Sequence, residues 1–149
     1  MPQYAYNKKG AFNYHIHETF EAGIQLTGAE VKSVKAKQLE LVGSYVSLRD
    51  NGLWLVGCHI TKYRHAARES NEDPDRTRKL LVKKSELKTL IGKMTSEGLT
   101  LIPLSLYSKG SFVKVEVALA RGKKKADKRE SIRKKEADRR MRSKMFRRR

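Results

Sequence analysis

The chain has 149 residues, of which 38% are hydrophobic and 34% are charged, and its formal net charge is +18. This length suits one folded domain with an appendage and argues against two independent cores. The charge favours a polyanionic partner, because neutralising phosphates releases condensed counterions. The alternatives are a basic surface that only keeps the protein in solution and a surface that binds anionic lipid.

Cysteine content and hydropathy indicate the compartment. Cys58 is the single cysteine, so no intrachain disulfide can form, and it lies in an apolar run where we expect a core residue. The first ten residues lack the apolar segment of a signal peptide, and no apolar run approaches the roughly 20 residues of a membrane span. We therefore expect a cytoplasmic protein. We expect no membrane binding either, because Arg and Lys surround the thin apolar stripe of the C-terminal segment almost completely.

The first predicted element is a long, bent strand over residues 14–26. Alternation places four residues on one face of this strand: Tyr14, Ile16, Glu18 and Phe20. Gly23 then interrupts the pattern, which predicts a bulge or a close approach of another backbone.

The middle of the chain predicts a short helix over residues 28–37 and then a hairpin. Residues 45–48 and 53–60 form its strands, and Asp50-Asn51-Gly52 supplies residues that accept positive φ in a tight turn. Residues 61–78 are polar and contain Pro74, which indicates a long loop with a functional role. A short buried strand over residues 80–82 follows.

The clearest helix follows, with Ser85 as the expected N-cap and Gly98 at its end. Its apolar residues at helical spacing are Leu87, Leu90, Ile91 and Met94. Strands over residues 99–107 and 112–120 close the domain. About six antiparallel strands with two or three packed helices predict a mainly β protein, a small closed or partly open barrel.

The residues do not indicate an enzyme. The four histidines, at positions 15, 17, 59 and 65, accompany no zinc-binding or nucleotide-binding motif, so we expect polar surface residues and neither a metal nor a cofactor. The acidic residues around Pro74 are interpreted as turn formers. We expect no catalytic residue.

Basic and aromatic residues occur together instead. Arg76, Arg78 and Lys79 directly precede the apolar pair Leu80-Leu81, so a basic rim borders an apolar strand. Aromatic side chains on a barrel stack on unpaired bases while Arg and Lys hold phosphates. We assign Phe20 and Trp54 to the core and leave Tyr14 and Tyr45 open to the surface.

Residues 121–149 form a basic tail, separate from a barrel domain at residues 1–120. The tail contains 16 Lys and Arg against four Asp and Glu, a net charge of +12. We expect it to be disordered when free, because the charges repel one another. Acid-before-base pairs at i, i+4, such as Glu130–Lys134 and Glu136–Arg140, each stabilise a helix by about 0.2–0.5 kcal/mol. Phosphates would remove the repulsion, so the tail should become helical on binding RNA.

Several stretches together resemble one family. FEAGI-x-L-x-G-x-EVKS, RTRKLL and GKKK-x-DKR, in this order and across nearly the whole chain, are similar to the SmpB family of SsrA-binding proteins. The resemblance implies an OB-like barrel without enzymatic activity. It also implies that the barrel binds the tRNA-like domain of transfer-messenger RNA and delivers it to stalled ribosomes for trans-translation. The tail would occupy the decoding centre and the empty mRNA channel, and we expect a monomer. A structural ribosomal protein with a basic extension is the alternative.

The resemblance also implies site residues. In the barrel, the matching RNA-binding positions are Asn7, Glu21 and Leu81. Charge and position add Lys8, Lys32, Tyr45, Arg76, Arg78 and Lys79. For Glu21, hydrogen bonds from a base or ribose and a structural salt bridge remain equal alternatives.

In the tail, the matching ribosome-binding positions are Gly122, Lys124, Asp127, Lys128, Arg129 and Met145. Gly122 would be the hinge between barrel and tail. Ala126 and Ala137 stand where relatives can have larger side chains, so a role that needs those side chains is not expected here.

Overall fold

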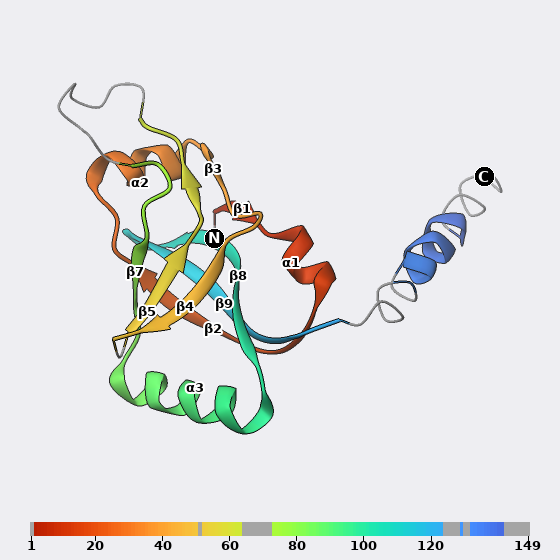
Figure 1. Ribbon diagram of the computed structural model, residues 1–149. Helices are drawn as coiled ribbons and strands as arrows, with labels where there is room; N and C mark the ends of the chain where they lie inside the picture. The colour runs from red at the N-terminus through yellow and green to blue at the C-terminus, as the bar shows by residue number, and fades with distance from the viewer. Residues whose placement is uncertain (1, 51, 64–72, 124–128, 130–131, 142–149) are drawn as a thin grey trace.

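The protein is described from a computed structural model, which covers residues 2–50, 52–63, 73–123, 129 and 132–141. Most strands join one antiparallel sheet in the order β1-β8-β9-β2-β7-β5-β4, and β3 pairs with β6 separately (Figure 1). The strands are β1 (Gln3–Tyr6), β2 (Tyr14–Ile24), β3 (Leu39–Glu40), β4 (Tyr45–Arg49), β5 (Gly52–Val56), β6 (His59–Ile60), β7 (Arg78–Leu81), β8 (Thr100–Lys109) and β9 (Phe112–Gly122). The barrel domain has three helices among its described residues, α1 (Lys8–Asn13), α2 (Gly28–Lys35) and α3 (Lys84–Glu97).

The sheet curls into a partly open barrel. β1 and β4 are its two edges, and β4 also comes close to β8. Figure 1 shows α2 at one end of the barrel and α3 at the other, with α1 at the side. The predicted mainly β class is confirmed, and of the two barrel forms the partly open one is observed. The sequence did not predict β1, α1 or β3.

A bulge in β2 changes the predicted facing of its residues. Ile16 pairs with Ala120, whereas Glu18 pairs with Leu119, so one extra residue of β2 lies between them. Ile16 and Glu18 therefore point to opposite faces, and the prediction that they share a face is wrong. Phe20 packs on the barrel core, as expected.

Gly23 marks a close approach of two strands, one of the two alternatives predicted for it. It pairs with Leu81 of β7 on one side and with Lys114 of β9 on the other. A Cβ atom added at Gly23 would lie only 3.2 Å from the Leu81 Cβ atom. A side chain at position 23 of β2 would therefore crowd Leu81 of β7, and glycine avoids this contact.

The two larger helices begin differently. In α2, Thr27 and Glu30 form a capping box, in which each side chain accepts a hydrogen bond from the other's backbone N–H. In α3 the N-cap is Lys83 and makes no side-chain cap, so the prediction of Ser85 as the cap is wrong. α3 ends at Gly98, whose φ of 63° suits glycine, as predicted.

The barrel core is apolar and includes Cys58. Its largest fully buried apolar side chains are Leu53, Leu55, Leu80, Leu101, Leu106, Leu119, Val34, Val115 and Val117. Cys58 is 0% exposed, and burial raises the pKa of its thiol to about 11. The thiol is therefore an inert core group, as the apolar run predicted.

A buried ion pair joins α2 to β7. Arg78 is 0% exposed and its Nε donates to Glu30 Oε2 at 2.7 Å. Its other nitrogens donate to the carbonyl oxygens of Cys58 at 2.6 Å and Pro74 at 2.9 Å. Arg76 also donates to both oxygens of Glu30. One carboxylate therefore holds the start of α2 and two arginines from the other half of the chain.

Removing the Glu30 carboxylate should destabilise the barrel strongly. The Glu30→Ala variant leaves Arg78 charged and buried without its partner, which costs about 3–5 kcal/mol. The matched control is Glu18→Ala, because Glu18 pairs with Lys93 at the surface; we expect a loss below about 1 kcal/mol there. Urea denaturation of both variants measures the difference. Equal losses would contradict a central role for Glu30.

The stabilisation by Glu30 should depend on pH in one direction. Burial by itself raises the pKa of Glu30, but hydrogen bonds from Arg76, Arg78 and the Thr27 backbone outweigh it, and the pKa is lowered. The stabilisation is therefore complete above the ordinary carboxyl pKa and is lost as pH falls through the lower pKa of the folded state. In urea denaturation from pH 7 to 3, the difference between the wild-type protein and Glu30→Ala should shrink below pH 4.5. A difference that grows in acid would contradict this.

Candidate nucleic-acid interface

The residues of β7 alternate between the core and the surface. Arg78 and Leu80 are buried, whereas Lys79 and Leu81 point outwards, and Leu81 is 51% exposed. Leu81 therefore lies at an exposed rim, and the prediction that residues 80–82 form a buried strand is wrong for Leu81. Arg78 has no exposed atom to offer a phosphate, so its assignment as an RNA contact is wrong. Arg76 is one-third exposed and its guanidinium is already paired with Glu30.

Leu81 borders a groove across β2, β7 and β9, which we call the Leu81 groove. Its volume is about 360 Å³, and its lining includes Gly23, Leu26, Val31, Leu81, Phe112, Val113 and Lys114. Phe112 is 69% exposed, the highest value among the large hydrophobic residues that the structure describes. Phe112 and Leu81 thus expose apolar side chains to solvent side by side with a lysine. This combination suits the face of a base and a neighbouring phosphate.

Glu21 lies beside this groove and is held in place. It is two residues before Gly23 on β2, and its Oε2 accepts a hydrogen bond from the Tyr107 hydroxyl at 2.5 Å. Lys109 Nζ lies 3.6 Å from Glu21 Oε1. The Tyr107 hydrogen bond and the charges of Lys109 and Lys114 lower the pKa of Glu21. The carboxylate is therefore ionised at neutral pH and accepts hydrogen bonds only.

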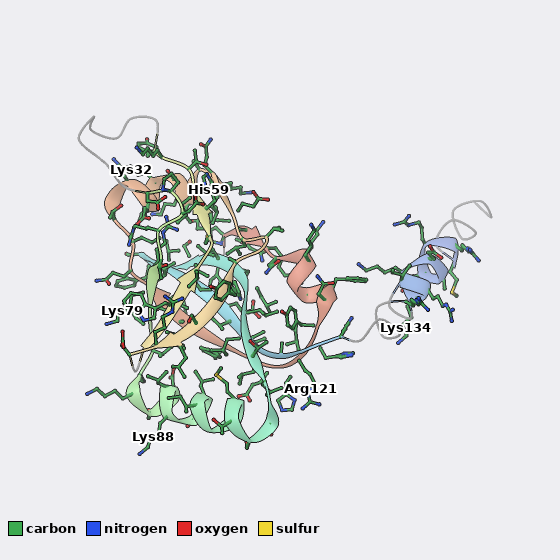
Figure 2. All side chains as sticks on the ribbon, viewed as in Figure 1. Lys32, His59, Lys79, Lys88, Arg121 and Lys134 are labelled. Carbon is green, nitrogen blue, oxygen red and sulfur yellow. The ribbon has the colours of Figure 1, made fainter. Side chains whose placement is uncertain are left out.

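Figure 2 shows the predicted basic residues Lys32 and Lys79, which come from α2 and β7, on the left of the view. Lys79 Nζ is 5.9 Å from the centre of the Trp54 ring, and Lys32 Nζ is 5.5 Å from that of Tyr63. Trp54 pairs with Lys79 across β5 and β7 and is only half-buried on the outer face. The assignment of Trp54 to the core is therefore wrong, and the pair forms a cation–aromatic surface.

Three other predicted residues lie around α1, away from the Leu81 groove. Asn7 is 3% exposed; its side chain caps α1 by accepting from the Gly10 N–H and donates to the Pro103 carbonyl. Asn7 therefore positions α1, and the little surface that it exposes lies in the cavity that Tyr45 also lines. Lys8 is exposed at the start of α1, and Tyr45 is 48% exposed in a second cavity of about 570 Å³.

Few tail positions lie among the described residues. Gly122 is the last residue of β9 and pairs with Tyr14, and Arg129 is helical and exposed. The other predicted tail positions, Lys124, Asp127, Lys128 and Met145, lie outside the described residues. Residues 132–141 are helical, and Figure 1 shows this helix projecting beyond α1. That the tail becomes helical on binding RNA stays a prediction. Disorder of the free tail and a hinge at Gly122 stay predictions.

Two of the four histidines contact carboxylates at the surface. His17 Nε2 lies 3.2 Å from Glu97, and His59 Nδ1 lies 2.8 Å from Asp75. Within the described part of the chain, no three His, Cys, Asp or Glu residues are arranged to hold a metal ion. No described helix is long and apolar enough to cross a membrane.

Comparison with known proteins identifies the family. The family model described as SmpB protein matches residues 4–147. The chain belongs to the SmpB family. An SsrA-binding protein of Leptothrix cholodnii is 52% identical over 128 residues, 86% of this chain and 83% of that protein. One of a Nostoc species is 48% identical over 135 residues, 91% of this chain and 87% of that protein.

A solved structure supports the fold of this SmpB family member. The structure, described as "tmRNA-SmpB: a journey to the center of the bacterial ribosome", contains a chain that is 40% identical. The two chains superimpose with a TM-score of 0.67, over 89% of this chain and 96% of that one. The OB-like SmpB fold predicted from the sequence is confirmed.

Sequence reasoning missed several residues of this SmpB surface. Tyr107, Lys109, Phe112 and Lys114 lie on β8 and β9 and come beside Glu21 and Leu81 only through strand pairing. The signal available in the sequence is the alternation along residues 112–120, which places Phe112, Lys114 and Glu116 on one face of the strand. Nothing in the sequence showed that this face is open to solvent.

Truncating Leu81 should weaken RNA binding without unfolding the protein. Leu81→Ala removes an exposed apolar side chain, so we expect about tenfold weaker binding of the tRNA-like domain of transfer-messenger RNA, from a loss of about 1.4 kcal/mol. The control is Ile16→Ala, because Ile16 is 42% exposed on β2 at the end far from Gly23. Filter binding and thermal melting measure both. A loss of binding equal to that of the control would remove Leu81 from the interface.

Proposed function

We propose that this protein binds the tRNA-like domain of transfer-messenger RNA and delivers it to stalled ribosomes for trans-translation. The observation that carries the proposal is the outer face around the Leu81 groove, where exposed apolar side chains and Lys114 line the groove and the fixed Glu21 carboxylate lies on β2 two residues before Gly23. The relatives named SsrA-binding protein and the related tmRNA–SmpB structure support the identity of the RNA.

The barrel and the tail have different tasks in this proposal. The barrel, residues 1–120, presents the groove with Glu21, Leu81, Lys79 and Lys32 to the RNA. The tail, residues 121–149, occupies the decoding centre and the empty mRNA channel, where rRNA neutralises its charges and extends its helix. Lys124, Asp127, Lys128, Arg129 and Met145 are its proposed contacts.

The protein acts by positioning an RNA and catalyses no reaction. Its described surface has an acceptor, cations and apolar groups, which are the elements of recognition. It works as a monomer in the bacterial cytoplasm, where it meets ribosomes and requires no cofactor.

Deleting the tail should separate the two tasks. Lys123 N donates to the Asn13 carbonyl at 2.9 Å, so the folded body extends beyond the predicted boundary at residue 120, to at least residue 123, and the deletion begins after it. Deletion of residues 124–149 should leave the affinity for the tRNA-like domain within about threefold at moderate salt, since the groove is intact. It should abolish tagging of stalled nascent chains in a reconstituted translation reaction.

Full-length protein serves as the reference, and an unchanged melting temperature shows that the truncated barrel is folded. Normal tagging by the truncated protein would contradict the assigned role of the tail. Loss of RNA binding with a folded barrel would contradict the assigned role of the groove.

A further inference from the structure

Strand register places one glycine in the middle of a row of side chains. Tyr107 pairs with Lys114, Lys114 with Gly23, and Gly23 with Leu81, so the row crosses β8, β9, β2 and β7. Because Gly23 has no side chain, the row has a gap between the Lys114 stem and Leu81. The Leu81 groove opens at this gap.

The walls of the groove have the chemistry of a base-binding site. Leu81 and Phe112 are 51% and 69% exposed and so present apolar surface to a ligand. The Lys114 ammonium lies 5.7 Å from the centre of the Phe112 ring, so a cation stands at the same wall. A flat apolar group bearing an anion, such as a nucleotide, matches both features.

The Glu21 carboxylate lies on β2, two residues before Gly23 of the groove. Tyr107 donates to Glu21 Oε2 and Lys109 approaches Oε1, which fixes the carboxylate over β9. Each carboxylate oxygen accepts more than one hydrogen bond, so both still have capacity. A carboxylate with two free acceptor positions matches a base edge that has two adjacent donors.

Guanine alone among the four bases has such an edge, with N1–H next to the N2 amino group. Adenine and cytosine each place a ring-nitrogen acceptor beside the amino donor, and uracil flanks its N3–H with two carbonyls. Those acceptors would face the carboxylate and be repelled.

We propose that the Leu81 groove binds an unpaired guanine of the RNA, with its face against Leu81 and Phe112 and its N1–H and N2 donors on Glu21. Tyr107 is a positioning residue, which acts only through Glu21. This inference rests on the proposed function, because it names the base that the groove selects.

Inosine substitution tests the base assignment, because inosine lacks only the N2 amino group of guanosine. The tRNA-like domain of transfer-messenger RNA is transcribed with sparse random inosine and separated into bound and free pools by filter binding. With wild-type protein, inosine at one unpaired guanosine should weaken binding about tenfold, from the loss of a hydrogen bond to a charged group.

The Glu21→Gln variant serves as the comparison in the same experiment. It should bind the unsubstituted RNA more weakly and show no inosine effect at that position, because its amide cannot accept both donors. Wild-type protein with no inosine effect at any unpaired guanosine would overturn the proposal, and so would an undiminished effect in Glu21→Gln. Failure of wild-type protein to bind the unsubstituted RNA would instead overturn the proposed function.

Two further variants test the wall and the positioning residue. Phe112→Ala should weaken RNA binding about tenfold with an unchanged melting temperature, whereas Tyr6→Ala, which removes another half-exposed aromatic ring, should not. Tyr107→Phe should reduce the inosine effect, a readout that a merely structural role would leave unchanged. An unaltered inosine effect in Tyr107→Phe would remove Tyr107 from the site.

Discussion

The buried ion pair between Glu30 and Arg78 is the contact on which the arrangement of the barrel depends. It joins the first turn of α2 to β7, and the same guanidinium holds the carbonyls of Cys58 and Pro74. Burying two charges is costly, so such a pair is tolerated only when every polar atom has a partner. Among the described residues that condition is met, since no buried side-chain nitrogen or oxygen lacks a hydrogen bond.

The ion pair also orients the binding surface. A strand that slips by one residue turns all its side chains to the other face. The inward position of Arg78 therefore determines that Lys79 and Leu81 point outwards. Gly23 lies next to Leu81 in the neighbouring strand. Because Gly23 has no side chain, a groove remains between Leu81 and Lys114. A structural contact inside the barrel thus sets the geometry of recognition outside it.

The local elements were largely predictable, whereas the facing of some side chains was not. Periodicity located α2, α3 and the strand pairs β4–β5 and β8–β9, because these elements form between neighbours in sequence. The bulge between Ile16 and Glu18 appears only when β2 pairs with β9, a strand about 100 residues later. Trp54 looked like a core residue because tryptophan is apolar, but its neighbours Leu53 and Leu55 take the inward positions.

The family, the mainly β class and the difference in charge between barrel and tail could be predicted from the sequence, because they depend on composition and local spacing. The helical spacing of the tail, which residues 132–141 follow, could also be predicted. Which charges serve the fold and which stay at the surface became clear from the tertiary structure. Arg78 and Lys79 are adjacent basic residues in the sequence. Arg78 is nevertheless buried, because it pairs with Glu30, which lies 48 residues earlier in the chain. A long-range partner, and not the residue type, settles whether a basic side chain is buried or available to a phosphate.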